Sequence, residues 1–381
     1  MIGPIETNIR LLFSANETDV AESLLPDLLS FTYDDRENNE ADEISIRLKD
    51  SDGKWAGRWM PDGAETVKAF ISKGTVSDNG LNRAELYCGR FFVDSLRVSG
   101  SPRIFEMRAV SIPLNKAIRK KVVTYPWEGE TLKNIAETIA KKAGVELIFD
   151  SEENPRYDRK DQTSESDLKF LSRVCEEEGL SIKVTDDQIV IFDQAYYEKL
   201  EPVQTVTLGE SDILSWGFES VQSETYRSCT VRYRDPKQKK KDSAGSHEIK
   251  KQLSNDAGGS NDDIHELLAG DTKKTNPAVM SHTYTDESVD ANGQEYVMKK
   301  RAKSLGEAKR LAKAKLRQLN MRRVTGSMTV LGDVRLVAGV VIACEGFGSF
   351  DGNFFIEQAT HSVTTGGYTT TLRLRRVNNN Y

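Results

Sequence analysis

The sequence predicts a mainly β chain of the α+β class: two related β-modules, the second split by an insertion, and a small α+β module between them. Two observations predict this. A Gly-x-Phe-Phe-aliphatic-acid pattern occurs twice, as Gly89–Asp94 and Gly352–Glu357. Between the two copies, from about residue 126 to residue 179, apolar residues follow the spacing of helices instead of strands.

Each copy of the repeat continues through an alternating strand, a turn and a second alternating strand. The turns are Ser99-Gly100-Ser101-Pro102 and Thr365-Gly366-Gly367. Similarity that extends over strand, turn and strand indicates two related modules. The alternative is two unrelated hairpins that both begin at a glycine. The second strands carry these alternating residues: Phe105, Met107 and Ala109 in the first copy, and Tyr368, Thr370, Leu372 and Leu374 in the second.

Composition limits the class of protein. The length of 381 residues suggests two to three domains, and a net charge of −6 argues against a general polyanion binder. We expect a chain made in a cytoplasm, because no signal peptide and no run of roughly 20 apolar residues is visible. The four cysteines are dispersed, which predicts buried thiols instead of a disulfide frame or a zinc site: Cys88, Cys175, Cys229 and Cys344.

The first β-module is predicted to span residues 1–114. Ile44, Ile46 and Leu48 alternate with polar residues, as expected of a strand with one buried face. Further strands are expected near residues 66–72, 83–88, 90–98 and 103–112. Their number and spacing favour a small barrel or sandwich.

The α+β module is predicted to span residues 115–200. A first helix should begin after Thr131 as N-cap and stop at Gly144. A second helix should open at Ser164, with Asp167 three residues on in a near-capping box, and end at Gly179. A hairpin around residues 186–187 closes the module.

The second β-module is predicted to combine residues 201–235 and 322–381, with strands near 203–208, 215–220 and 228–233. Residues 236–298 are polar and low in apolar content, so we expect a partly disordered insertion whose deletion over 240–290 leaves the fold intact. Residues 299–321 have the pattern of a basic amphipathic helix docked on a core. Its charged face is expected to be solvated or to meet an acidic partner instead of nucleic acid.

Motifs of catalysis are not found. The sequence has no Walker loop, HExxH, GxSxG or dinucleotide fingerprint. We therefore predict no catalytic residue, no cofactor and no metal. His361 is expected to be a hydrogen-bonded strand histidine. The histidines of the polar insertion raise the alternative of a metal site, which we do not favour because residues in such loops are more often solvated. Its ligands would be His247, His265 and His282 with Asp262 or Asp263.

Paired acids raise the alternative of a glycosidase, because two carboxylates carry that hydrolysis. The two runs, Glu176-Glu177-Glu178 and Asp186-Asp187, are expected at a solvated helix end and a hairpin tip. The first helix of the α+β module with its following strand is also similar to a lysin-motif glycan-binding fold.

With these elements in place, the whole chain resembles the late control D family, the baseplate hub proteins of contractile-tailed phages and related injection machines. The order of several motifs over most of the chain carries the resemblance. In the first module these are Asp42–Asp50 with Trp55 and Trp59; in the middle, Thr131–Ala136 and Ser164–Leu180; at the end, Leu336–Gly339, Phe350–Ile356 and His361–Leu372. Residues 236–297 match nothing firmly.

The resemblance implies two tube-like β-barrels per chain and a homotrimer that forms a pseudo-sixfold ring. Such a ring joins a hexameric tail tube to a trimeric spike, and its other partners are the baseplate wedge and tape-measure proteins. Because the chain stops at Tyr381, we expect the spike to be a separate protein. The implied place is the baseplate of a virion or injection particle assembled in the bacterial cytoplasm. It implies no enzyme activity, no sequence-specific nucleic-acid binding and no membrane insertion.

Two alternatives stay open beside the structural hub. One is a module that binds cell-wall glycan, and the other is a tail-associated peptidoglycan hydrolase. The residues that contact partners are not identified by any motif.

Overall fold

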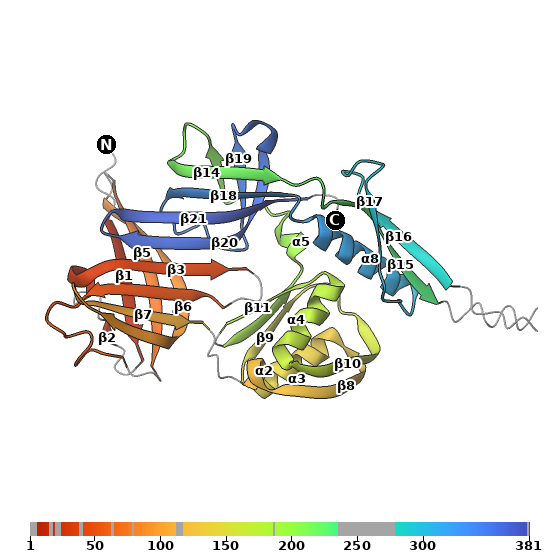
Figure 1. The fold of residues 1–381 in the computed structure, drawn as a ribbon, viewed down its shortest axis with the longest axis horizontal. Coiled ribbons are helices and arrows are strands. Elements are labelled where there is room, and N and C mark those ends of the chain that lie inside the picture. Colours follow the sequence, from red (N-terminus) through yellow and green to blue (C-terminus); the bar gives the residue numbers. More distant parts are fainter. Residues whose placement is uncertain are drawn as a thin grey trace, which may run out of the picture. The chain divides into compact units, whose positions relative to one another are not determined.

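The structure is a computed structural model of the chain (Figure 1). Residues up to Ser223 and from Met321 onward make one compact unit, and Glu224–Asn320 make a second. The structure describes residues 6–14, 18–19, 24–37, 41–61, 65–77, 80–111, 117–185, 187–234, 279–378 and 381.

The first β-module is an antiparallel sheet wrapped around one apolar core. Its strands lie in the order β3-β4-β7-β6-β5-β1, with the short β2 at the far edge. Ile44, Ile46 and Leu48 are buried as their alternation predicts, together with Phe91 of the repeat. The elements are β1 (Glu6–Phe13), β2 (Thr18–Asp19), η1 (Leu25–Asp27), β3 (Leu28–Arg36), β4 (Glu43–Lys49), β5 (Thr66–Ser77), β6 (Gly80–Ser99) and β7 (Ile104–Val110).

The second β-module has the same strand order around a core of its own. Its strands run β14-β18-β21-β20, with β19 paired to β20 and β13 paired to β19. Phe354, the equivalent of Phe91, is fully buried in that core. The elements are β13 (Gln204–Thr207), β14 (Ile213–Ser220), β18 (Val324–Leu331), β19 (Val341–Glu345), η2 (Gly348–Phe350), β20 (Gly352–Thr364) and β21 (Gly367–Arg376).

Strand register shows that the two modules are related in detail. The glycine that opens each copy of the repeat has positive φ, +123° at Gly89 and +133° at Gly352. Irregularities in the ladders fall at matching positions. One pair lies at the acid that ends each repeat, between Val93 and Ser95 and between Ile356 and Gln358. The other pair lies between Leu28 and Ser30 in β3 and between Ile213 and Ser215 in β14. Matching bulges are hard to obtain by chance. The predicted fold class, with two related β-modules, is confirmed.

The α+β module consists of helices packed beside two small sheets, β8·β10 and β9-β12-β11. The Thr131 hydroxyl caps α3 by accepting from the Asn134 N–H, and Gly144 ends that helix in the left-handed conformation, both as predicted. The elements are α2 (Ala117–Lys120), β8 (Val122–Thr131), α3 (Leu132–Ala143), β9 (Glu146–Asp150), β10 (Arg156–Ser166), α4 (Asp167–Glu178), β11 (Ser181–Val184), β12 (Gln188–Phe192) and α5 (Gln194–Tyr197).

The predicted start of the second helix was wrong by two residues. Helix α4 is capped by Ser166, whose hydroxyl accepts from the Lys169 N–H. Ser164 is not the cap, because β10 stays paired with β8 as far as Ser166↔Val122. Gly179 ends α4 as predicted, with φ of +80°.

The smaller unit corrects the prediction for the split module. Its elements are β15 (Tyr226–Arg234), β16 (Val279–Thr285), β17 (Gln294–Val297) and α8 (Leu305–Asn320). We assigned β15 to the second β-module, but it pairs with β16 and β17 in a separate sheet. The first segment of the second β-module therefore ends near Ser223, where the smaller unit begins.

The expectation that residues 236–298 lack core positions was also wrong where the structure describes them. Residues 279–285 and 294–297 form strands, and Val289 is buried. Composition misled because a short sheet covered by one helix needs few apolar residues. Deleting 240–290 would remove β16. Residues 235–278, with the candidate metal ligands His247, His265, Asp262 and Asp263, lie outside the described residues.

We predict that Gly89→Ala and Gly352→Ala destabilise the protein to a similar extent. An added Cβ meets only ordinary contacts at Gly89 and nothing within 4 Å at Gly352, so the cost is conformational, about 1–3 kcal/mol. Urea unfolding measures it. Gly100→Ala, a turn position with open space, is the control and should be neutral. A large cost at only one of the two glycines would contradict their equivalence.

A second prediction concerns the smaller unit. Leu311 of α8 is 1% exposed, so Leu311→Ala should cost about 2–5 kcal/mol through lost contacts and a cavity. Hydrogen exchange of the β15 amides should accelerate accordingly. Leu305→Ala, on the same helix but 42% exposed, should leave these amides protected. Equal exchange in the two variants would refute the assignment of α8 as the cover of this sheet.

Candidate assembly interface

A backbone ladder joins the two β-modules. The first part of β20 pairs with β19, and its second part pairs with β3 of the first module, from Gln358↔Arg36 to Thr364↔Ser30. Figure 1 shows β20 (blue) and β3 (red-orange) side by side. The ladder continues through β4 and β21 on its two sides, so both modules share one sheet. This junction shows how the two β-modules join edge to edge within one chain.

Several side chains along this ladder interact across it or with the neighbouring strand. The Thr360 hydroxyl donates to Asp34 across the two strands. His361 stacks on Tyr33 with 5.8 Å between ring centroids, and its Nδ1 lies 2.7 Å from the Tyr368 hydroxyl. Burial lowers the pKa of His361 to about 4, so the ring is neutral at physiological pH. His361 is thus a hydrogen-bonded strand histidine, as its sequence context predicts.

A buried ionic contact lies where the α+β module meets both β-modules. Lys183 Nζ of β11 lies 2.8 Å from Asp35 Oδ1 and 3.4 Å from Asp42 Oδ2. The other oxygen of Asp35 accepts from the Ala338 N–H of the second β-module at 2.8 Å. Burial raises the pKa of Asp42 to about 6. One carboxylate of β3 therefore contacts all three modules of the larger unit.

A second buried cluster surrounds the end of β3. The Gln194 amide of α5 donates to Glu37 Oε1 at 2.7 Å. Arg375 of β21 is 1% exposed; it pairs with Glu198, and its Nε lies 3.4 Å from Glu357 Oε1. Burial raises the pKa of Glu37 to about 7 although Arg375 and the Gln194 amide oppose the shift. Removing Glu198 or Glu357 would leave the buried charge of Arg375 less well paired, which is costly, so the correct joining of these strands is favoured.

Two residues of the acidic run Glu176–Glu178 make structural contacts. Lys160 Nζ lies 2.6 Å from Glu177, and Arg173 Nη1 lies 3.2 Å from the same carboxylate. Glu178 is buried and accepts from the Tyr157 hydroxyl at 3.2 Å. The prediction that the whole run is solvated was therefore wrong for Glu178. It failed because β10 packs against this end of α4.

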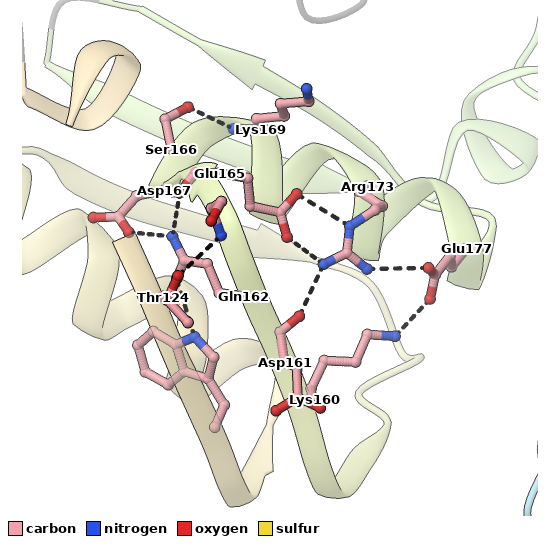
Figure 2. Close-up of polar contacts among 12 residues, drawn as sticks. Thr124, Lys160, Asp161, Gln162, Glu165, Ser166, Asp167, Lys169, Arg173 and Glu177 are labelled. Atoms are coloured by element: carbon pink, nitrogen blue, oxygen red, sulfur yellow. Dashed lines mark hydrogen bonds and ion pairs between the residues drawn. The ribbon is translucent and has the colours of Figure 1, made fainter. Parts of the chain in front are cut away.

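The middle-module motif is explained by the same network (Figure 2). Arg173 of α4 forms an ion pair with Glu165 at the end of β10, and this guanidinium lowers the pKa of Glu165. The Gln162 amide accepts from Trp127 Nε1 at 3.3 Å and donates to Asp167 Oδ1 at 2.8 Å. These polar groups hold α4 against the β8·β10 pair. The residues of the Ser164–Leu180 motif therefore stabilise the fold of the α+β module.

The remaining candidates do not converge on a site in the described chain. Asp187 accepts from the Thr185 hydroxyl at 3.0 Å on an exposed turn, and Asp186 lies outside the described residues. His282 lies on β16 of the smaller unit. Among the described residues, no group of three or more His, Cys, Asp and Glu could hold a metal ion. None of the helices in the described ranges is long and apolar enough to cross a membrane.

Comparison with known proteins identifies the family. Residues 112–367 match the phage tail baseplate hub (GPD) family. The chain belongs to this family. It is 24% identical over 381 residues to the probable baseplate hub protein of Escherichia phage 186, covering 92% of that protein. It is 26% identical over 226 residues to the probable baseplate hub protein of Escherichia phage P2, with 58% of this chain and 55% of that protein covered.

Solved structures share the fold of this baseplate hub. A 43 kDa tail protein from prophage MuSo2 of Shewanella oneidensis matches with TM-score 0.67 and 11% identity, covering 98% of this chain and 99% of that one. A tail protein from Neisseria meningitidis MC58 gives TM-score 0.64 and 15% identity, with 97% and 96% covered. An Escherichia coli component of the type VI secretion system gives 0.52 and 12%, with 100% and 77% covered. The predicted resemblance to baseplate hubs is confirmed.

We predict that Glu37→Gln changes the pH dependence of stability. The carboxyl has a pKa near 7 in the folded protein against an ordinary 4.5, so the stability it contributes is fully present below about pH 4.5 and is lost as the pH rises to about 7. Glutamine keeps the acceptor for Gln194. The variant should be more stable than wild type at pH 8, by up to roughly 3 kcal/mol, and equal to it at pH 4.5.

Urea unfolding at the two pH values measures this difference. Glu106→Gln is the matched control, because Glu106 is half-exposed and pairs with Arg47 on the surface. The same pH dependence in Glu37→Gln and Glu106→Gln would contradict the buried protonated carboxyl.

Proposed function

We propose that this baseplate hub forms a homotrimeric ring with pseudo-sixfold symmetry, which joins a hexameric tail tube to a separate trimeric spike. Its other expected partners are the baseplate wedge and tape-measure proteins, and its expected place is the particle baseplate, assembled in the bacterial cytoplasm. The observation that carries the proposal is the doubled module: strand order, opening glycine and bulge positions agree between the two copies.

The doubled module supports the proposed symmetry. Three chains with two related modules each would present six similar β-modules to a hexameric tube. The other parts of the chain would occur three times in the ring, which matches a trimeric spike. Homo-oligomers with closed cyclic symmetry fix the number of contacts. Obligate interfaces of about 2,000 Å² or more are expected, because the ring would have to hold its neighbours during contraction.

The proposed role is mechanical, without a reaction of its own. Three of the candidate residues in the described chain make structural contacts: Glu177 with Lys160, Glu178 with Tyr157 and His361 with Tyr368. No specific observation favours the glycan-binding or hydrolase alternatives. Membership of a structural baseplate family supports a non-enzymatic role.

Mass measurement by light scattering and native mass spectrometry tests the proposal. We expect a species of three chains, either alone or when tube and spike proteins are added, and a complex that contains all three proteins. A chain that stays monomeric at every concentration with both partners present would contradict the proposed ring.

A further inference from the structure

The junction between β3 and β20 has a counterpart on the outside of the chain. By strand order and bulge position, β14 is the equivalent of β3, and β6 is the equivalent of β20. In the first module β3 accepts the second half of β20. The equivalent halves, β14 and the end of β6, are not joined to each other within the chain.

Both equivalents have an open edge in the part of the chain that the structure describes. Among the described strands, β14 is the last of its sheet and pairs with β18 alone. From Ser95 to Ser99, β6 pairs only with β7 among the described strands, because its ladder with β5 stops at Phe92. Open edges in natural sheets are commonly protected by charge, proline or cover.

Beside exposed charged residues, these edges carry exposed apolar side chains. Leu214 and Trp216 on β14 are 57% and 47% exposed, and Val98 on β6 is 43% exposed. Exposed aromatic and aliphatic residues beside an unpaired edge are typical of a surface that another chain covers. The in-chain junction indicates the kind of partner: a second copy of the same strand type.

We propose that β14 of one copy pairs antiparallel with the end of β6 of the next copy, in the register of the β3·β20 junction. This inference rests on the proposed ring and assigns its contact between chains. Each chain then offers one β14 edge and one β6 edge, so the contact is head-to-tail, and rotation closes it into a ring.

The ladders fix the equivalent residues. In the first module, successive ladder pairs lead from Asp34 through Glu43 and Val110 to Phe92, the second phenylalanine of the repeat. In the second module, the corresponding pairs lead from Glu219 through Thr325 and Arg375 to Phe355, the second phenylalanine of the other copy. Asp34 and Glu219 are therefore equivalent. Thr360 and Arg97 are equivalent as well, since each lies five residues after the second phenylalanine of its repeat.

Transferring the in-chain pair Asp34↔Thr360 places Glu219 opposite Arg97 of the next copy. Both side chains are exposed in the single chain. The carboxylate of Glu219 would therefore face the guanidinium of Arg97. At the same position of the β3·β20 junction, Asp34 accepts from the Thr360 hydroxyl. Opposite charges directly across two strands are favourable, and like charges are unfavourable. The same register pairs Phe218 with Val98 and brings two apolar side chains together.

Disulfide trapping tests this register on the full chain, copurified with tube and spike proteins. Glu219→Cys with Arg97→Cys should give dimers and covalent trimers under mild oxidation, because paired strands hold Cα atoms about 4.5–5.5 Å apart. The background is low, since Cys88, Cys175, Cys229 and Cys344 are buried. Each single-cysteine variant should stay uncrosslinked, and coexpression of the two should restore dimers, because the contact is head-to-tail.

Glu219→Cys with Asp94→Cys is the off-register control. Asp94 is also exposed but lies three residues away, roughly 10 Å along the strand, beyond disulfide reach. A trimer by mass in which the Arg97 pair fails to crosslink, or crosslinks no better than the Asp94 pair, would overturn this edge contact while the ring stands. Absence of any trimer would overturn the proposed ring itself.

Charge reversal provides an independent readout. Glu219→Arg and Arg97→Glu should each weaken trimer formation roughly tenfold or more, and the double variant should recover most of the loss. Glu137→Arg, an exposed change on α3, should leave the trimer unaffected. Loss that the double variant does not recover would contradict the Glu219–Arg97 pair.

Discussion

The pairing of β20 with β3 is the constraint on which the larger unit depends. Main-chain hydrogen bonds along Gln358–Thr364 merge two sheets that could each have ended in an open edge. Such a ladder fixes the register of one module against the other, because a slip of one residue would turn every side chain to the opposite face. β21 pairs with β20 on both sides of the bulge just before Gln358. On the other edge, β20 pairs with β19 before the bulge and with β3 after it.

Buried charged side chains then favour one arrangement of the three modules. Asp35 contacts Lys183 of the α+β module and the Ala338 N–H of the second β-module. Arg375 is buried between Glu198 and Glu357. Burying these ions gives little net stability, but an incorrect arrangement of the modules would leave them unpaired, which is costly. Backbone pairing supplies continuity, and the ionic contacts supply one defined arrangement.

Local patterns predicted the local structure. The Gly-Phe-Phe repeat identified two related modules, and Thr131, Gly144 and Gly179 marked helix ends, because caps and turns depend on a few neighbouring residues. Periodicity gives the buried face of a strand but not its partner, so β15 was placed in the wrong sheet and the β3·β20 junction went unpredicted. The burial of Glu178 depends on a distant strand, which the sequence around it does not reveal.

The central claim is that related modules repeat around an axis. Electron cryomicroscopy of the assembled hub tests it most directly, through the rotational symmetry of the ring that the β-modules form. The account predicts six similar sheets with exact threefold symmetry, in which ladders within chains alternate with ladders between chains. A ring with another number of modules, or one in which only one module of each chain takes part, would contradict it.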